Sequence, residues 1–412
     1  MKNPEIIKNP VFKKIPRQIG LAVDIGTTTI SAALVNLETQ QELINSACFN
    51  SQLVFGEDVI SRIGFCLKSR TNQKKLQNIL ISDINSLVRA MLKKVSMPTE
   101  KIYAAVLVGN TAMQQFFLCR DVSGLITPPY QAENIKAEEG LAGNYGINLN
   151  KKARIRFLPA IGGFVGADIV SEIVFLEISK QKGVNLIIDI GTNGEMVISH
   201  GNKIKAASCA AGPAFEGGQI TCGMRAERGA IERVGVNNHR LDIGTVGNVS
   251  PVGICGSGLI DLAAVMLKLN LMDKSGRMKN KRFLLYENKR RKIIITQEDI
   301  RQLQLAKSAM GTGIEVLLRD CRISNQDISQ VYICGVFGNY LNIRNAKAIG
   351  LLPDVPDEKI IFCGNAALQG AKRVLYSERV FKETIRLARS TTHLSLTQSK
   401  YFKAIYPRNL LF

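Results

Sequence analysis

Two short stretches of the chain place an aspartate, a glycine and a threonine at the end of an apolar run. They read Asp24-Ile-Gly-Thr-Thr and Asp189-Ile-Gly-Thr-Asn-Gly, and the two aspartates are 165 residues apart (189 − 24). A turn of this kind offers backbone N–H groups and hydroxyls to phosphate oxygens, and the aspartate offers a hard oxygen ligand to Mg²⁺. One such turn is weak evidence, whereas two of them predict a site for a nucleoside triphosphate.

We assign contacts to Mg²⁺ and phosphate to Asp24 and Asp189, and the alternative for both is capping of an ordinary turn. Glycines are needed in such turns because a side chain would block the approach of the backbone to phosphate. The residues expected to contact phosphate are Gly26, Thr27, Thr28, Gly191, Thr192, Asn193 and Gly194.

The surrounding sequence predicts the elements that must position these turns. Residues 19–35 and 184–199 each predict a β-hairpin with the polar residues at its tip. Apolar residues at helical spacing predict a helix over 76–96, and an apolar run predicts a strand over 101–109. Later segments predict a strand over 330–338 and helices over 366–376 and 380–389. The alternation of strands and helices favours an α/β fold.

The repeat has the size of a domain, so it implies two related α/β lobes rather than a solenoid. The predicted organisation is a basic tail or linker over 1–18, a first lobe over 19–183, and a second lobe with the C-terminal helices over 184–412.

The composition is that of a folded protein without a membrane span. The chain has 412 residues, 46% of them apolar, and a mean hydropathy of +0.05, which excludes an intrinsically disordered chain. No apolar run reaches the length of about 18 residues that a membrane-spanning helix needs. The N-terminal stretch lacks the apolar segment of a signal peptide, so we expect a cytoplasmic protein with no membrane association.

The nine cysteines are widely spread, and no two of them lie within ten residues of each other. This spacing excludes the usual local ligand sets of zinc and iron–sulfur sites. We expect no iron–sulfur cluster in this chain, and thiols that are reduced and mostly buried. Cys209 lies nearest to a predicted site, and we interpret it as a buried core thiol.

The order of four motifs resembles the actin, Hsp70 and sugar-kinase ATPase superfamily over about residues 19–370. The two Asp-Ile-Gly-Thr turns are similar to its two phosphate loops, Cys-Gly-Val-Phe-Gly-Asn at 334–339 to its adenosine loop, and 162–168 to its first interdomain connection. The resemblance implies a two-lobed actin-like (ribonuclease H-like) fold, with duplicated lobes around a nucleotide cleft. It also implies ATP and Mg²⁺ as ligands.

The resemblance also implies roles for further residues. Asp168 would orient or deprotonate the attacking water, and its alternative role is that of a helix N-cap. The adenosine pocket would be lined by Gly335, Gly338 and Asn339, which would otherwise form a tight turn. Further nucleotide contacts would come from Gly212, Glu216, Gly256 and Ser257. The alternatives are an acid favoured by a helix N-terminus for Glu216 and close helix packing for 256–258. For Lys307 we expect an exposed position on a helix, and the alternative is a contact with the nucleotide base or phosphate.

Longer stretches resemble the reductive activators of corrinoid proteins. These stretches are NxQ at 50–52, GxDVISRI at 56–63, GNTAM at 109–113, SCAAGPAFEG at 208–217, CGSG at 255–258, DIRxLQLAK at 299–307 and AxxIGLLP at 346–353. The resemblance implies ATP hydrolysis that drives lobe closure and docking, coupled to reduction of a corrinoid from Co(II) to Co(I). Members of that family normally carry an iron–sulfur domain, so this chain would take its electron from a separate ferredoxin or other iron–sulfur protein.

Two other functions remain open at this point. One is a small-molecule kinase of the same superfamily, and the other is a nucleotide-gated regulatory or binding protein without a redox role. The net charge of +20 (54 − 34) would suit acidic protein partners, and no motif for nucleic acid is present. Residues 274–292 hold nine Lys and Arg against one acid. We expect an acidic corrinoid protein or electron donor to dock there, and the alternative is an ordinary solvated surface loop. A homodimer is compatible with the sequence.

Overall fold

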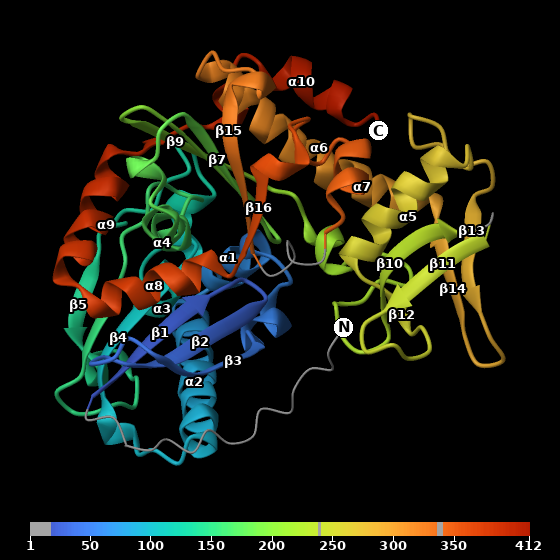
Figure 1. Cartoon of the computed structure of the whole chain (residues 1–412). Helices are drawn as coiled ribbons and strands as arrows, with labels where there is room; N and C mark the ends of the chain where they lie inside the picture. Colours follow the sequence, from blue (N-terminus) through green and yellow to red (C-terminus); the bar gives the residue numbers. More distant parts are fainter. Residues whose placement is uncertain (1–17, 238–239, 336–340) are drawn as a thin grey trace. The chain divides into compact units, whose positions relative to one another are not determined.

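The computed structural model describes residues 18–237, 240–335 and 341–412 (Figure 1). The chain divides into two compact units. The first unit extends to Ile178 and adds Ala366–Thr391, and the second unit contains Ser179–Asn365 and Thr392–Phe412. Each unit has its own hydrophobic core.

The first unit is built on a sheet of six strands in the order β3-β2-β1-β4-β6-β5. Its central strand β1 runs antiparallel to β2 and parallel to β4, and every residue of β1 except Asp24 is buried. The bounds are β1 (Ile19–Ile25), β2 (Thr29–Asn36), β3 (Glu42–Phe49), β4 (Ile102–Gly109), β5 (Glu138–Leu141) and β6 (Arg154–Phe157).

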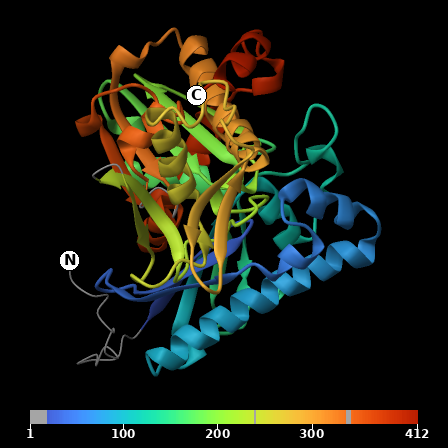
Figure 2. The ribbon, with the colours of Figure 1, turned by 90° about the vertical axis from the view of Figure 1, so that its right-hand side faces the viewer.

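The helices of this unit cover its sheet. They are α1 (Val59–Leu67), α2 (Arg70–Lys94), α3 (Thr111–Leu118), α4 (Ala167–Leu176), α8 (Ala366–Tyr376) and α9 (Glu378–Ser390). The 25-residue helix α2 packs on β2 and β3 (Figure 2), while α8 packs on β1 and β4 and against α4.

The position of α8 and α9 differs from the division predicted from the sequence, which put both helices in the second lobe. The apolar face of α8, with Leu368, Ala371 and Val374, is buried in the core of the first unit together with Phe381 of α9. The reason is that their apolar side chains find their packing partners in the first sheet, although they come late in the sequence.

The second unit repeats the design of the first. Its main sheet has the order β16-β15-β7-β8-β9-β17, with β7 antiparallel to β8 and parallel to β15. The bounds are β7 (Val184–Ile190), β8 (Gly194–His200), β9 (Lys203–Cys209), β15 (Ile328–Cys334), β16 (Ile360–Gly364) and β17 (Thr392–His393). The order β9-β8-β7-β15-β16 therefore matches β3-β2-β1-β4-β6, which confirms the predicted duplication of an α/β lobe.

Further elements complete the second unit. Its helices are α5 (Gly256–Lys268), α6 (Gln297–Asp320), α7 (Ile343–Ala348) and α10 (Phe402–Asn409). A small sheet is formed by β10 (Ala230–Asn237), β11 (Arg240–Thr245) and β12 (Gly253–Ile254), and a hairpin by β13 (Arg282–Glu287) and β14 (Lys292–Thr296). In the part of the chain that the structure describes, no helix combines the length and apolarity needed to cross a bilayer.

Candidate functional site

The first turn, residues 24–28, closes the β1–β2 hairpin at the carboxyl end of β1. The Gly26 N–H donates to the carbonyl oxygen of Thr29 at 3.0 Å. A Cβ on Gly26 would lie 2.6 Å from that same oxygen, so only glycine fits this tight turn without a shift of the backbone. Asp24 is half-buried and pairs with Ser31. Only the pair Ile25 and Ile30 lies between it and the tip of the hairpin.

Two buried asparagines donate hydrogen bonds to the first turn. Asn50 donates from Nδ2 to the carbonyl oxygen of Gly26, and Asn110 donates from Nδ2 to Oγ1 of Thr27, each at 3.0 Å. Both residues were outside the predicted site. They belong to the motifs NxQ and GNTAM that carry the family resemblance, and this was the only sequence signal for them. We interpret them as positioning residues, because each fixes the turn rather than presenting a free group.

The second turn, residues 189–194, closes the β7–β8 hairpin with a loop that is one residue shorter, because Ile190 pairs with Gly194 whereas Ile25 pairs with Ile30 in the first hairpin. The Gly191 N–H donates to the carbonyl oxygen of Asn193 at 3.1 Å, and Asp189 pairs in register with Glu195. Thr192 is buried, and its hydroxyl donates to Oε1 of Glu216 at 2.5 Å. The structure therefore brings the predicted residue Glu216 to the second turn, where its carboxylate accepts from Thr192.

Gly335 also meets the second turn. It follows β15, whose last residue Cys334 pairs in register with Asp189. Its φ is +84°, a conformation that favours glycine, and a Cβ on it would lie 2.5 Å from Oδ1 of Asp189. The predicted adenosine and phosphate segments thus come together at one edge of the second sheet. Gly338 and Asn339, the other two adenosine residues predicted, lie outside the described residues.

Asp168 is the second residue of helix α4. The start of this helix lies next to Asn110, which supports the turn at 24–28. The N-cap of α4 is Gly166, so the alternative that Asp168 is the cap is wrong. A Cβ on Gly166 would lie 2.4 Å from Cα of Asn110, which brings the start of α4 against Asn110. The Asp168 carboxylate accepts from the Ile169 N–H at 2.8 Å, and the helix dipole favours an acid at this position.

Other predicted residues take part in local turns and in packing. Gly212 has a φ of +77° and precedes the short 3₁₀ turn Pro213–Glu216. The Ser257 side chain is buried at the start of α5, and its hydroxyl donates to the carbonyl oxygen of Glu232 at 3.0 Å. A Cβ on Gly258 would lie 2.2 Å from the carbonyl oxygen of Ile231, which favours close helix packing as the role of 256–258.

Lys307 is buried in α6, so the expectation that it is exposed is wrong. Its ammonium group donates to the carbonyl oxygen of Leu411 and lies 5.2 Å from the centre of the Phe412 ring. Burial lowers the pKa of Lys307 to about 8. Cys209 is buried as expected, and burial raises the pKa of its thiol well above the ordinary range.

The basic segment 274–292 is exposed at all nine of its Lys and Arg residues. It forms the loop before β13, the strand β13 and the turn into β14, with which β13 pairs as an antiparallel hairpin that begins at Arg282. The one acid of the segment, Glu287, pairs with Lys292 at 2.6 Å. The segment therefore presents a strongly positive surface.

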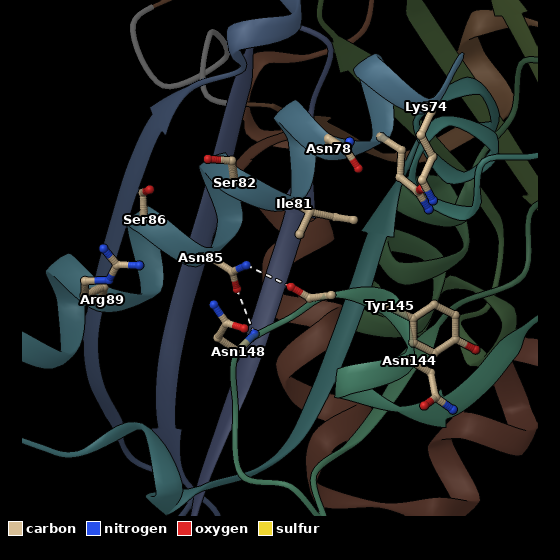
Figure 3. Close-up of a pocket in the computed structure, with 12 residues that line it drawn as sticks. Lys74, Asn78, Ile81, Ser82, Asn85, Ser86, Arg89, Asn144, Tyr145 and Asn148 are labelled. Atoms are coloured by element: carbon tan, nitrogen blue, oxygen red, sulfur yellow. Dashed lines mark hydrogen bonds between the residues drawn. The ribbon is translucent and has the colours of Figure 1, made fainter. Parts of the chain in front are cut away.

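A polar groove of about 460 Å³ lies elsewhere, between α2 and the loop at 144–148 of the first unit (Figure 3). Asn85 bridges its two walls, because its amide donates to the Gly146 carbonyl oxygen and accepts from the Asn148 N–H, each at 2.9 Å. None of the predicted nucleotide residues lines this groove. Among the described residues, no group of three or more His, Cys, Asp or Glu side chains could hold a metal ion.

Two protein-family models match consecutive parts of the chain. The model described as the RACo middle region matches residues 19–181, and the model described as the C-terminal domain of RACo, the ASKHA domain, matches residues 183–412. The ASKHA match supports the predicted actin-like ATPase fold.

Individual relatives agree with these matches. The corrinoid activation enzyme RamQ of Eubacterium limosum is 34% identical over 418 residues, covering 95% of this chain and 70% of its own length. The [Co(II) methylated amine-specific corrinoid protein] reductase of Methanosarcina barkeri is 26% identical over 428 residues, covering 94% of this chain and 76% of its own. A solved structure titled reductive activator for corrinoid, iron–sulfur protein superposes with a TM-score of 0.89 at 36% identity, over 97% of this chain and 67% of that one.

Proposed function

The chain belongs to the RACo family, and from this premise we propose that it uses ATP to drive the reductive activation of a corrinoid protein. The corrinoid cobalt would be returned from Co(II) to Co(I), the state that accepts methyl groups. The names of both curated relatives support this substrate. The observation in this chain that carries the proposal is the pair of duplicated hairpins with their glycine turns.

The two turns fit the phosphates of a nucleotide. Gly26 and Gly335 stand where a Cβ would collide with the Thr29 carbonyl oxygen and the Asp189 carboxylate, so these two positions need glycine for the turn segments to pack tightly. We assign phosphate contacts to the N–H groups and hydroxyls of 26–28 and 191–194. Mg²⁺, when bound, would neutralise charge on the phosphate oxygens. We assign its ligation, direct or through water, to Asp24 and Asp189.

Asp168 is our candidate for orienting the attacking water. Its carboxylate accepts from the Ile169 N–H at the start of α4, which fixes the position of the side chain. A carboxylate with a fixed position is what general-base assistance of hydrolysis requires.

We further propose that the electron comes from a separate iron–sulfur protein. The described residues bring together no set of ligands for a cluster, and the nine cysteines lie far apart in the sequence. The exposed positive segment 274–292 is the surface that we assign to acidic partners, because charge complementarity steers association.

A reduction assay tests the proposed activity. The protein is mixed with ATP, Mg²⁺, a low-potential electron donor and a corrinoid protein in the Co(II) state, and the Co(I) absorbance is followed. We expect Co(I) to accumulate only with ATP, and ATP hydrolysis to rise when the corrinoid protein is added. The double variant Asp24→Ala, Asp189→Ala should lose both signals. Full Co(I) formation by this variant would contradict ATP-driven activation.

A charge variant tests the assigned docking surface. Lys279, Lys281, Lys289 and Arg290 are all exposed, and changing all four to Gln should slow association with the corrinoid protein at low salt. The matched control changes Lys93, Lys94, Lys151 and Lys152, four exposed lysines of the first unit, to Gln. Equal slowing by both variants would show a general charge effect and contradict docking at 274–292.

A further inference from the structure

Two cysteines lie side by side at the carboxyl ends of β15 and β16. The two strands are parallel, with Ile333 opposite Phe362 and Cys334 opposite Gly364, so the register shifts by one residue between these pairs. Cys363 is the extra residue at this irregularity and therefore lies beside Cys334. The Cys334 side chain is hydrogen-bonded to the Cys363 thiol, and this lowers the pKa of Cys363 although burial opposes the shift.

This pair adjoins the second turn. On the other side of β15, Cys334 pairs in register with Asp189. The next residue, Gly335, makes the close approach to Asp189 in which a Cβ would lie 2.5 Å from Oδ1. Cys363, Cys334 and Asp189 thus follow one another across three neighbouring strands of the same sheet.

We propose that Cys334 and Cys363 form a modification site, an oxidisable dithiol whose disulfide form weakens nucleotide binding at Asp189. The nucleotide half of this proposal rests on the proposed function, whereas the formation of the disulfide does not. The oxidants concerned are small-molecule disulfides of the glutathione class.

The geometry allows the bond to form. Neighbouring strands lie about 4.8 Å apart, and disulfides span Cα separations of about 4.4–6.8 Å. Cys363 is half-buried and reachable, whereas Cys334 is fully buried. The accessible thiol would react first and the buried one second.

The chemistry balances in two exchange steps. The Cys363 thiolate attacks one sulfur of the small disulfide, which breaks that S–S bond and releases one small thiol. The Cys334 thiolate then attacks the Cys363 sulfur of the mixed disulfide, forming the Cys334–Cys363 bond and releasing the second small thiol. The protein dithiol loses two electrons and two protons, and the small disulfide gains them.

The disulfide would act on the nucleotide site through Gly335. The two sulfurs must close from hydrogen-bonding separation to about 2.05 Å, and this draws the end of β15 toward β16. Gly335 lies so close to Asp189 that an added Cβ would meet Oδ1 at 2.5 Å, so a movement of the end of β15 changes the approach of these two residues. A displacement of about 1 Å in a binding constellation can cost up to about a hundredfold.

Other cysteines offer an internal contrast. Burial raises the pKa of Cys66 to about 11, with a smaller contribution from Cys119, so little thiolate forms there at neutral pH. Cys209 is buried, and burial raises the pKa of its thiol. Oxidation should therefore select the Cys334–Cys363 pair.

The full-length protein is incubated with glutathione disulfide, alkylated, and mapped by peptide mass spectrometry. ATP binding with Mg²⁺ is measured by calorimetry on the reduced, oxidised and re-reduced protein. We expect a Cys334–Cys363 disulfide, an ATP Kd raised by about tenfold or more, and recovery after reduction. Cys363→Ser should abolish the response to oxidation, whereas Cys321→Ser, at a half-buried cysteine of the same unit, should respond like the wild type.

Two results would overturn the proposal. One is the absence of the Cys334–Cys363 disulfide at high oxidant. The other is a disulfide form whose ATP Kd stays within about twofold of the reduced value. If the reduced protein binds no ATP, the proposed function fails together with the nucleotide half of this proposal, and the disulfide map still decides the other half.

Discussion

The first and second turns share one hairpin design, but different kinds of side chain support them. At the first turn the supporting groups are neutral amides, from Asn50 and Asn110. At the second turn they are acidic: Glu216 accepts from Thr192, and Glu195 lies in register opposite Asp189. The duplicated hairpins differ by one residue in the length of the turn, and they also differ in the charge around it.

This difference indicates that two similar turns can contribute differently to the binding of one nucleotide and its Mg²⁺. Neutral donors around the first turn suit phosphate oxygens, which further carboxylates would repel. Additional carboxylates around the second turn suit a divalent cation, whose binding strengthens with the number of charged oxygen groups. We therefore expect the first turn to dominate nucleotide affinity and the second to dominate the requirement for Mg²⁺.

Asn110→Asp should have the largest effect, because it gives the first turn an acid like those of the second. Aspartate can still cap α3 by accepting from the Met113 N–H, so the fold should survive. The added charge beside Thr27 should weaken ATP binding by about tenfold to a hundredfold in calorimetry. Asn148→Asp, at an exposed residue of the same unit, is the control. Equal affinities for both variants would show that the first turn does not hold phosphate.

Glycine-to-alanine changes compare the tightness of the two turns. A new Cβ at position 26 meets the Thr29 carbonyl oxygen at 2.6 Å, whereas one at position 191 meets the Asn193 carbonyl oxygen at 3.3 Å. Gly26→Ala should lower the free energy of unfolding by about 1–3 kcal/mol. Gly191→Ala should lower it by less than about 1 kcal/mol. Urea unfolding measures both, and a reversed order would contradict the geometry of the turns.

Glu216→Gln tests the acidic character of the second turn. Glutamine keeps an oxygen that can accept from the Thr192 hydroxyl but removes the negative charge. The Mg²⁺ concentration that half-saturates ATP hydrolysis should rise by about threefold to tenfold, with thermal unfolding unchanged. Glu227→Gln, at an exposed acid of the same unit, should leave the Mg²⁺ requirement as it is. If Glu216→Gln needs the same Mg²⁺ concentration as the wild type, the proposal that the second turn dominates the requirement for Mg²⁺ is wrong.

The smallest expected effect is a pH dependence of the free energy of unfolding. It arises from Lys307 in the second unit. Helix α6 carries Met310, which lies against Gly194 of the second turn, and Lys307, whose pKa burial lowers to about 8. The unfolded chain keeps a lysine pKa of about 10.4. Between these values the unfolded chain binds a proton that the native protein does not, so stability should rise with pH above about 8. Below pH 8 both states are protonated, and this contribution is constant.

The measurement compares urea unfolding of the wild type and Lys307→Met from pH 7 to 10. The stability difference between them should move in favour of the wild type above pH 8, by no more than about 1.4 kcal/mol per pH unit. Lys268→Met, at an exposed lysine of α5, should show no such trend relative to the wild type. A flat difference for Lys307→Met would mean that Lys307 stays charged in the folded protein. The side chains that support the first turn, Asn50 and Asn110, do not titrate, so we expect no such pH-dependent contribution to stability from them.

The sequence by itself determined the repeated hairpins, the α/β class and the segments that meet at the second turn. These features follow from local patterns: an apolar strand, an aspartate at its end and a glycine turn specify a hairpin tip whatever surrounds it. The predicted strands and helices over 101–109, 366–376 and 380–389 are present as β4, α8 and α9, within one or two residues. The family resemblance added the adenosine segment, of which Gly335 is described.

Only the tertiary structure decided which side chains surround those local patterns. Asn50 and Asn110 reach the first turn from 24 and 83 residues away in the sequence. Lys307 looks like a surface lysine in its own helix and is buried because the chain end packs over it. Helices α8 and α9 join the first unit, and Cys334 and Cys363 become neighbours only through the pairing of β15 with β16. Such contacts depend on long-range packing, which a local sequence pattern does not encode.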